Sequence, residues 1–355
     1  MSFTVKSYAA ESPDAPLKLH ELERREVLPD DVLIDIIYTG VCHSDLHTAH
    51  SDWPGTIYPV VTGHEIVGKV SAVGKDVTKH KVGDMVAVGC MVDSCGKCTQ
   101  CKADQEMFCE EGMVGTYSAP EPRFPGHSTA GGYSQKVVVQ QNFVVKVPEG
   151  LQKPELLSGV APILCAGITT YSPLRQNNIG KGSKVAVAGL GGLGHMGTKL
   201  AKALGAEVAV ISRSHKKDAQ AKELGADYVI SSSDPEELKK YANHFELLLD
   251  TVSVDHDLDP YFSLLAPFGN LCVLGHIGVF EKKLHSGPLV AGNRKLSGSV
   301  IGGIKETQEL LDFCSEQSII ADHQVIPMEK INEAWSQMTE GDVANRFVID
   351  IANFK

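Results

Sequence analysis

A series of apolar segments after Pro162 constrains the fold more than any other feature of this 355-residue chain. Each segment has the length of a strand, and the stretches between them are long enough for helices. Strands of a parallel sheet are apolar along nearly their whole length because helices cover both faces of the sheet. We therefore predict a doubly wound α/β domain in this part of the chain. The segments are KVAVAGL (184–190), EVAVIS (207–212), ADYVIS (226–231), FELLLDTVS (245–253), NLCVLGH (270–276) and KLSGSVIGG (295–303).

The first of these segments leads directly into the glycine-rich turn GLGGLG, in which Gly189, Gly191 and Gly194 match the pattern GxGxxG. Apolar residues at helical spacing follow in HMGTKLAKALGA, and Gly205 is placed to end that helix. Between a strand and a helix, this pattern predicts a pyrophosphate-binding turn, because backbone N–H groups at the helix N-terminus can meet the negative charge. The alternatives are a tight turn without a ligand and a P-loop, which the missing GK[ST] order disfavours.

The end of the second predicted strand indicates which dinucleotide binds. An NAD site has Asp or Glu about 20 residues after the glycines, where the ribose 2′-hydroxyl lies. This chain has instead the basic stretch SRSHKK (212–217). A carboxylate would repel a 2′-phosphate, whereas Arg and Lys attract it, so the stretch predicts NADP(H). A solvated basic turn is the alternative.

The preceding part of the chain predicts a β-rich domain. Short apolar runs separated by glycine extend from Val32 to about Pro148. Within them, Thr116–Gly132 is rich in Pro and Gly and is expected to be a loop. After Gly303, an amphipathic helix (ETQELLDFCSEQ) and a final strand (RFVIDIA) are expected to pack against this first domain.

Four of the nine cysteines lie in the pattern CxxCxxCx7C, namely Cys95, Cys98, Cys101 and Cys109. In a reducing compartment a metal site is favoured over disulfides. Four thiolates leave zinc no vacant position, so we predict a structural site. A redox-active CxxC is the alternative, but no thioredoxin-like βαβ pattern surrounds it. Cys90, Cys272 and Cys314 are expected to be buried packing residues.

Charge and hydropathy limit the partners and the location. The formal net charge is −11, and no block of Lys or Arg occurs, so we expect neither nucleic acid nor a membrane surface as a partner. The N-terminal segment does not read as a secretion signal, and no apolar run approaches the roughly 18 residues of a membrane span. A cytoplasmic protein is expected.

Three further motifs, GVCHSDLH, TGHEIVG and PILCAGITT, complete a resemblance to the zinc-dependent medium-chain alcohol dehydrogenases. Within that family the chain is most similar to the NADP-dependent cinnamyl alcohol dehydrogenase and aldehyde reductase branch, over essentially its whole length. The resemblance implies a GroES-like catalytic domain (1–160 and 303–355), with a structural-zinc lobe at about 90–112, and a Rossmann NADP-binding domain (161–302).

The resemblance also implies a second, catalytic zinc. Cys42, His64 and Cys165 match its ligands, and such a set leaves one position open for substrate. Glu65 matches an exchangeable or second-shell ligand. Asp45 matches the carboxylate that supports the zinc-bound His.

Further roles follow from the same resemblance. Ser44 and His47 match the residues that carry the alcohol proton toward solvent, and Trp53 and the 116–132 loop are candidates for substrate contacts. The implied cofactor contacts are Ser44, Thr169, Gly189, Leu190, Gly191, Gly192, Leu193, Gly194, His195, Ser212, Arg213, Ser214, Lys217, Thr251, Gly275, Ser299, Val300 and Ile301.

The resemblance implies reversible hydride transfer between NADPH and a small aldehyde, of cinnamyl, benzylic or aliphatic type, at the catalytic zinc. An NADP-dependent polyol or secondary-alcohol dehydrogenase and a catalytically silent NADPH-binding protein are the alternatives. The family also implies a homodimer formed through the edge of the Rossmann sheet, with KLSGSVIGG as the candidate strand.

Overall fold

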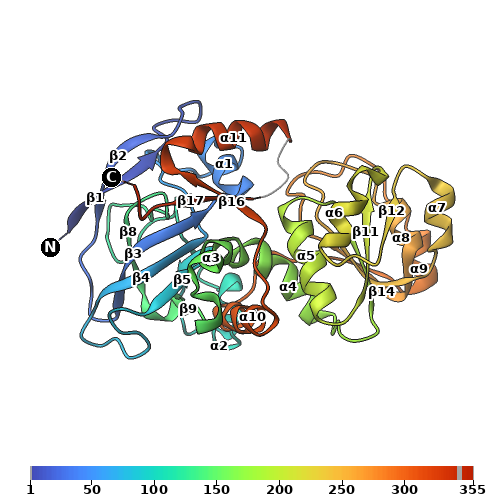
Figure 1. The fold of residues 1–355 in the computed structure, drawn as a ribbon, viewed down its shortest axis with the longest axis horizontal. Coiled ribbons are helices and arrows are strands. Elements are labelled where there is room, and N and C mark those ends of the chain that lie inside the picture. Colours follow the sequence, from blue (N-terminus) through green and yellow to red (C-terminus); the bar gives the residue numbers. More distant parts are fainter. Residues whose placement is uncertain (1, 342–345, 355) are drawn as a thin grey trace. The chain divides into compact units, whose positions relative to one another are not determined.

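The structure is a computed structural model that describes residues 2–341 and 346–354. The chain divides into two compact units, Met1–Cys165 with Gly303–Lys355, and Ala166–Gly302. Figure 1 shows both, with the first unit formed from the two ends of the chain. The final strand, Arg346–Asp350, therefore lies in the same unit as the N-terminal segment.

The unit Ala166–Gly302 is built on a six-stranded sheet whose strand order is β12-β11-β10-β13-β14-β15. Every pair in it is parallel. This is the order of a doubly wound dinucleotide-binding fold, and it confirms the predicted α/β class. The strands are β10 (Lys184–Ala188), β11 (Glu207–Ser212), β12 (Tyr228–Ser231), β13 (Phe245–Asp250), β14 (Leu265–Val273) and β15 (Lys295–Gly298). The helices are α4 (Ala166–Gln176), α5 (Gly192–Ala203), α6 (Asp218–Glu223), α7 (Pro235–Lys240), α8 (Asp259–Leu264) and α9 (Gly287–Gly292).

The other unit is built around a seven-stranded sheet with the order β16-β17-β3-β4-β5-β9, in which β8 also pairs with β3. Hairpin β1-β2 and the pair β6-β7 form two separate two-stranded sheets. The strands are β1 (Phe3–Ala9), β2 (Lys18–Arg24), β3 (Asp31–Gly40), β4 (Ile66–Val73), β5 (Met85–Val88), β6 (Met91–Asp93), β7 (Val114–Gly115), β8 (Lys136–Gln140), β9 (Val145–Lys146), β16 (His323–Pro327) and β17 (Arg346–Asp350).

Helices of this unit are short apart from two near the C-terminus. They are α1 (His43–Ala49), α2 (Thr99–Lys102), α3 (Pro154–Leu157), α10 (Ile304–Gln317) and α11 (Ile331–Glu340), with the 3-10 helices η1 (Glu106–Phe108) and η4 (Ser158–Leu164) among the connections. Sequence analysis did not anticipate hairpin β1-β2 or helix α1. Helix α1 has only seven residues, and its buried face is too short to produce a recognisable period.

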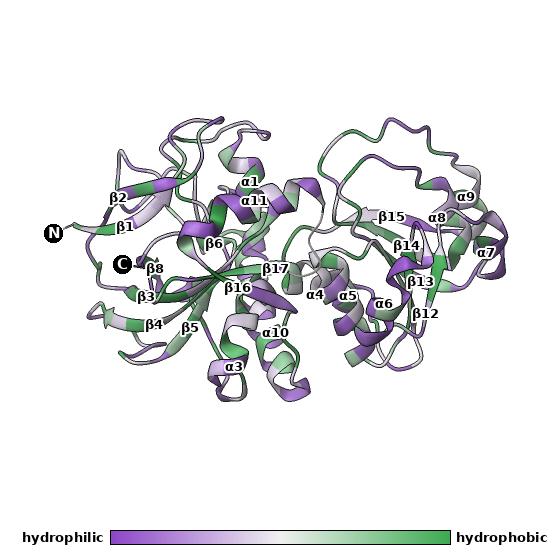
Figure 2. Ribbon diagram, turned by 45° about the horizontal axis from the view of Figure 1, so that its top comes forward, coloured by the Kyte–Doolittle hydropathy of each residue, from purple (hydrophilic) through white to green (hydrophobic). Residues whose placement is uncertain are grey.

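Hydrophobic residues are concentrated in the strands of the two large sheets. Strands such as β3 and β17 are largely hydrophobic in Figure 2, whereas surface helix α7 carries many hydrophilic residues. Among residues 2–341 and 346–354, no single helix is long and apolar enough to cross a membrane, and one bent pair, Pro154–Leu164 with Ala166–Gln176, passes by length and composition only.

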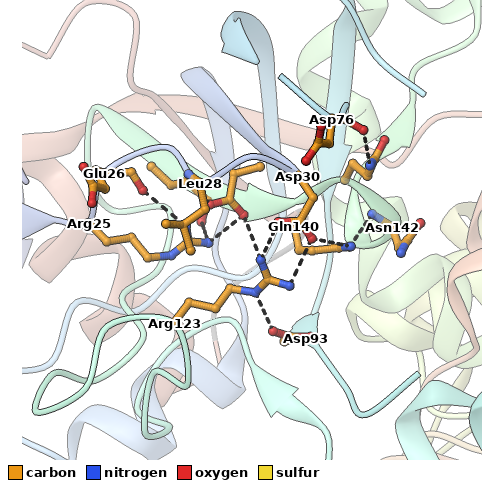
Figure 3. A network of polar contacts seen from close by, with 12 residues as sticks. Arg25, Glu26, Leu28, Asp30, Asp76, Asp93, Arg123, Gln140 and Asn142 are labelled. Carbon is orange, nitrogen blue, oxygen red and sulfur yellow. Dashed lines mark hydrogen bonds and ion pairs between the residues drawn. The ribbon is translucent and has the colours of Figure 1, made fainter. Parts of the chain in front are cut away.

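An ion-pair network anchors the 116–132 loop to β6 and to the segment before β3, within the first unit (Figure 3). Arg123 donates to Asp30 and to Asp93, both at 2.9 Å. Arg25 pairs with buried Asp31, which lies next to Asp30 in the chain. Because Arg123 is partly shielded from water, these charge-assisted bonds hold the loop more firmly than exposed pairs would.

Candidate functional site

The side chains of Cys42, His64, Glu65 and Cys165 converge within the first unit. One donor atom from each lies within 4.8 Å of all the others. The Sγ atoms of Cys42 and Cys165 are 3.9 Å apart. Two thiolates on one tetrahedral zinc, with Zn–S distances of about 2.3 Å, stand about 3.8 Å apart, so the geometry fits zinc.

Local structure explains how these ligands are presented. Cys42 is the N-cap of α1, His64 and Glu65 directly precede β4, and Cys165 ends η4. Gly63 has φ +98°, a conformation that strongly favours glycine, and this turn delivers His64 into the cluster. Three separate parts of the chain therefore supply the ligand set.

Asp45 connects two of these ligands. Its Oδ1 accepts hydrogen bonds from the Gly63 N–H and from His64 Nδ1, both at 2.9 Å. Its Oδ2 accepts one from the Cys42 N–H at 2.9 Å. Because Nδ1 of His64 is engaged, Nε2 is the nitrogen that is left for a metal.

The two cysteines of the cluster are shifted in opposite directions by their mutual hydrogen bond. It holds the pKa of the Cys42 thiol well below its ordinary value and raises the pKa of Cys165. A thiolate is the form that binds zinc, so Cys42 favours that form.

Glu65 is fully buried and pairs with Arg346 at the start of β17. Burial raises the pKa of Glu65 to about 8, although the Arg346 guanidinium acts in the opposite direction. Its other oxygen, Oε2, has no hydrogen-bond partner among the described residues. This buried orphan oxygen beside three zinc-type donors fits an exchangeable ligand. Arg346 lies 281 positions from Glu65, and no sequence pattern indicated it.

Ser44 and His47 both lie on α1, beside the metal cluster. The Ser44 hydroxyl is 3.7 Å from Cys42 Sγ. His47 Nδ1 is 2.7 Å from Asp52 Oδ2, and its side chain is 38% exposed. The Trp53 ring lies 5.2 Å from the His47 ring. Sequence analysis missed Asp52, although its position five residues after His47 could have suggested the contact.

Cys90 is a correction to the sequence analysis. Cys272 and Cys314 are buried, as expected, but Cys90 is only half-buried. A hydrogen bond with Cys165 lowers the pKa of Cys90, so this third thiol lies against the candidate catalytic ligands. No spacing rule could have shown this, because Cys90 and Cys165 belong to different segments.

The four cysteines of the CxxCxxCx7C pattern form a separate cluster with donor atoms within 4.8 Å of one another. The Sγ atoms of Cys95 and Cys101 are 3.9 Å apart, which again fits a tetrahedral zinc. Backbone N–H groups of Cys101 and Glu110 lower the pKa of Cys98 to about 6, which favours its thiolate. All nine cysteines of the chain are free, so no disulfide competes with metal binding.

The glycines of GLGGLG have three different roles in the second unit. Gly189 has φ +91°, which forms the tight turn after β10. A Cβ on Gly194 would lie 2.2 Å from the Gly189 carbonyl oxygen, so α5 can approach β10 only without a side chain there. A Cβ on Gly191 would meet nothing within 4 Å, so this face is open to a pyrophosphate.

Other predicted cofactor residues share the same edge of the sheet. Thr251 follows β13, Gly275 follows β14, and Ser299–Ile301 follow β15. The Thr251 hydroxyl donates to the Ala188 carbonyl at 2.7 Å, directly below the glycine turn. Leu190, His195 and Thr169 are buried, whereas Gly192 and Leu193 are partly exposed in the first turn of α5.

Within the basic stretch after β11, one side chain is held by carboxylates and two others are not. His215 is held by Asp218 at 3.0 Å and by Glu237 at 3.1 Å. Arg213 and Lys217 form no ion pair with any residue that the structure describes, and both are exposed. Ser212 and Ser214 are partly buried beside them. The cations that a 2′-phosphate needs are therefore not already neutralised.

The parallel sheet with its open glycine turn fits a dinucleotide, and the two clusters of donor atoms each fit a metal ion. This combination is typical of metal-dependent dehydrogenases. Residues 28–149 match the family model described as alcohol dehydrogenase GroES-like domain, and residues 192–316 match the model described as zinc-binding dehydrogenase.

Known proteins similar to the chain cover nearly all of it. It is 48% identical to "Aldehyde reductase YahK" of Escherichia coli, with 98% of each chain covered. It is 50% identical to "NADP-dependent alcohol dehydrogenase C 1" of Mycolicibacterium smegmatis, with 99% of each covered. A cinnamyl alcohol dehydrogenase structure from Helicobacter pylori, complexed with NADP(H), superposes with a TM-score of 0.91 at 41% identity, with 99% of each chain covered. The chain belongs to the zinc-binding alcohol dehydrogenase family, which confirms the resemblance.

Proposed function

We propose that the protein is a zinc-dependent, NADP(H)-dependent aldehyde reductase that also runs in reverse as an alcohol dehydrogenase. The observation that carries this proposal is the convergence of Cys42, His64, Glu65 and Cys165 within 4.8 Å. In this set Glu65 can exchange and only Cys42, His64 and Cys165 are permanent ligands. The four-cysteine cluster has four permanent ligands. A substrate oxygen can therefore bind only in the first set. The similar aldehyde reductase and NADP-dependent alcohol dehydrogenase support the same reaction and cofactor.

The two units take different parts in this proposal. Residues of Met1–Cys165 with Gly303–Lys355 form the catalytic domain, and Ala166–Gly302 forms the cofactor-binding domain. When bound, zinc acts as a Lewis acid toward a carbonyl oxygen, and NADPH is the hydride source. Cys42, His64 and Cys165 would hold the metal, and the GLGGLG turn would hold the pyrophosphate.

The chain's own residues manage the proton. The Ser44 hydroxyl, beside Cys42, is placed to hydrogen-bond the substrate oxygen. His47 receives or returns the proton, and Asp52 fixes the ring by accepting from Nδ1, so that Nε2 is the nitrogen that exchanges. The exposure of His47 gives that proton a route to solvent.

The test is an NADPH-oxidation screen over benzylic, cinnamyl and aliphatic aldehydes, with NADH in parallel and polyols and secondary alcohols in the oxidative direction. We expect an aldehyde to give the highest kcat/KM, and NADPH to exceed NADH by at least about tenfold, because a charge-assisted bond contributes about 1.5–3 kcal/mol. Replacing Arg213 and Lys217 by Ser should remove most of that preference. Lys216→Ser is the matched control, since Lys216 is exposed but not a predicted contact. Faster turnover with NADH, or none with any aldehyde at full zinc content, would overturn the proposal.

We also propose a homodimer formed through β15. This strand is one edge of the parallel sheet, so one side of its backbone is unpaired. Apolar side chains are exposed on it and just after it, namely Leu296 and Val300. Light scattering should give twice the 38.2 kDa chain mass, and Leu296→Glu should shift the protein toward monomer. A monomer at micromolar concentration would contradict this proposal.

The cytoplasm is the proposed location. All nine cysteines are free, in the two clusters, beside one of them or in the core, which favours a compartment that keeps thiols reduced.

A further inference from the structure

Asp45 is fully buried, and its carboxylate has a fourth donor besides the Cys42 N–H, the Gly63 N–H and His64. The Tyr133 hydroxyl donates to Oδ2 at 3.0 Å. A carboxylate has about four acceptor positions. The Tyr133 phenol is therefore, with the Cys42 N–H, one of two donors to Oδ2 of a carboxylate that also contacts two proposed zinc ligands.

Tyr133 is itself rigidly held against the turn that presents His64. Its side chain is completely buried, and the Tyr133 N–H donates to the Thr62 carbonyl at 3.0 Å. A Cβ on Gly63 would lie 2.7 Å from Cδ1 of the Tyr133 ring, so the ring fills the space that glycine leaves. Buried Arg24 donates to the carbonyls of Ala130 and Gly131 at 2.6 and 2.8 Å, which fixes the approach to Tyr133.

The phenol is suited to donate and not to titrate. Burial raises the pKa of Tyr133 well above its ordinary value, and the Asp45 carboxylate adds to the effect. A phenol that stays protonated keeps its O–H on Asp45 throughout the working pH range. Tyr117 is a second phenol nearby, half-buried, with its hydroxyl 3.0 Å from His64 Nδ1.

We propose that Tyr133 is a positioning residue for the zinc ligand His64, acting through Asp45. The inference rests on the proposed function, because it assumes that His64 binds the catalytic zinc. Without the phenol, Oδ2 loses one of its two donors in a site from which water is excluded. The carboxylate then orients His64 and the Cys42 N–H less firmly, and the metal dissociates faster.

The experiment follows zinc release from the full-length protein to the chelator 4-(2-pyridylazo)resorcinol. The release phase that Cys165→Ser abolishes is the catalytic zinc, and the other phase, from the four-cysteine cluster, serves as an internal reference. Asp45→Asn should speed the catalytic phase by about 10- to 100-fold, the usual effect of losing a partner of a ligating His. Tyr133 contacts Asp45 and not the ligand itself, so Tyr133→Phe should speed the catalytic phase less, on the order of fivefold.

Tyr58→Phe is the matched control. It also deletes one hydroxyl, which donates to the Ala49 carbonyl at 2.7 Å and touches no proposed ligand. It should leave both release phases within about twofold of the unchanged protein. In all variants an unchanged reference phase and melting temperature show that the fold is intact.

A double variant tests whether Tyr133 acts through Asp45. In the Asp45→Asn background, Tyr133→Phe should add little further release, because the bond that it removes no longer has its carboxylate. Fully additive effects, or a catalytic phase unchanged in Tyr133→Phe, would overturn the inference. Neither outcome depends on NADPH turnover, so graded zinc release without aldehyde reduction would instead disprove the proposed function.

Discussion

Replacing Cys165 by Ser should lower kcat/KM by about 1,000-fold or more while the protein stays folded. The hydroxyl of serine keeps its proton near neutral pH and is a poor zinc ligand, so the open cluster loses one of its two thiolates. Losing metal polarisation of the carbonyl removes several kcal/mol of transition-state stabilisation, and about 4 kcal/mol corresponds to that factor.

Zinc content measured together with steady-state kinetics checks this result. The variant should fall from about two zinc ions per chain to about one, because the four-cysteine cluster is untouched. Cys314→Ala is the control, since Cys314 is completely buried in α10 and belongs to neither cluster. A Cys165→Ser protein that retains one zinc and more than a tenth of the activity would place the chemistry elsewhere.

Replacing Cys101 by Ser should have the opposite signature, a loss of folding that precedes any loss of chemistry. Four-thiolate zinc sites contribute on the order of 10 kcal/mol to the folding of the segments that they close. The lobe also supports α10, because Glu106 Oε2 accepts from the Ile304 N–H at 3.1 Å and Asp104 pairs with Lys305 at 3.2 Å. Its disruption therefore removes a cap from the first turn of that helix.

Calorimetry and zinc analysis separate the two possible effects. We expect the melting temperature of Cys101→Ser to fall by about 10 °C or more, on the scale of about 2–4 °C per kcal/mol for domains of 150–250 residues. The fraction that remains folded should keep its catalytic zinc. A stable, fully assembled but inactive variant would contradict the division between a structural and a catalytic cluster.

The predictions that the structure confirms are those that depend on short stretches of sequence. The apolar segments of residues 184–303 became the strands of one parallel sheet, because alternating strands and helices leave few other ways to bury both faces. Gly205, with φ +93°, directly follows the C-cap of α5, the helix after the glycine turn. In the other unit, 116–132 is a loop without a named helix or strand.

Contacts between distant parts of the chain were not predictable in this way. Arg346 pairs with Glu65, Tyr133 bonds Asp45, and Cys90 lies against Cys165. The sequence did not point to Arg346 or Tyr133, and Cys90 was expected to be a packing residue. None belongs to a periodic pattern or a fixed spacing, and each partner lies on another element.

By itself the sequence determined the two fold classes, the glycine turn and the residue types available for two metal clusters, because local periodicity and backbone stereochemistry act over a few residues. Only the tertiary structure decided what surrounds those groups. Asp45 receives Tyr133 from 88 positions away, and Glu65 receives Arg346 from 281. Burial and hydrogen bonding between residues so far apart in the sequence arise only when the chain folds into its tertiary structure. They set the charge and orientation of the proposed ligands.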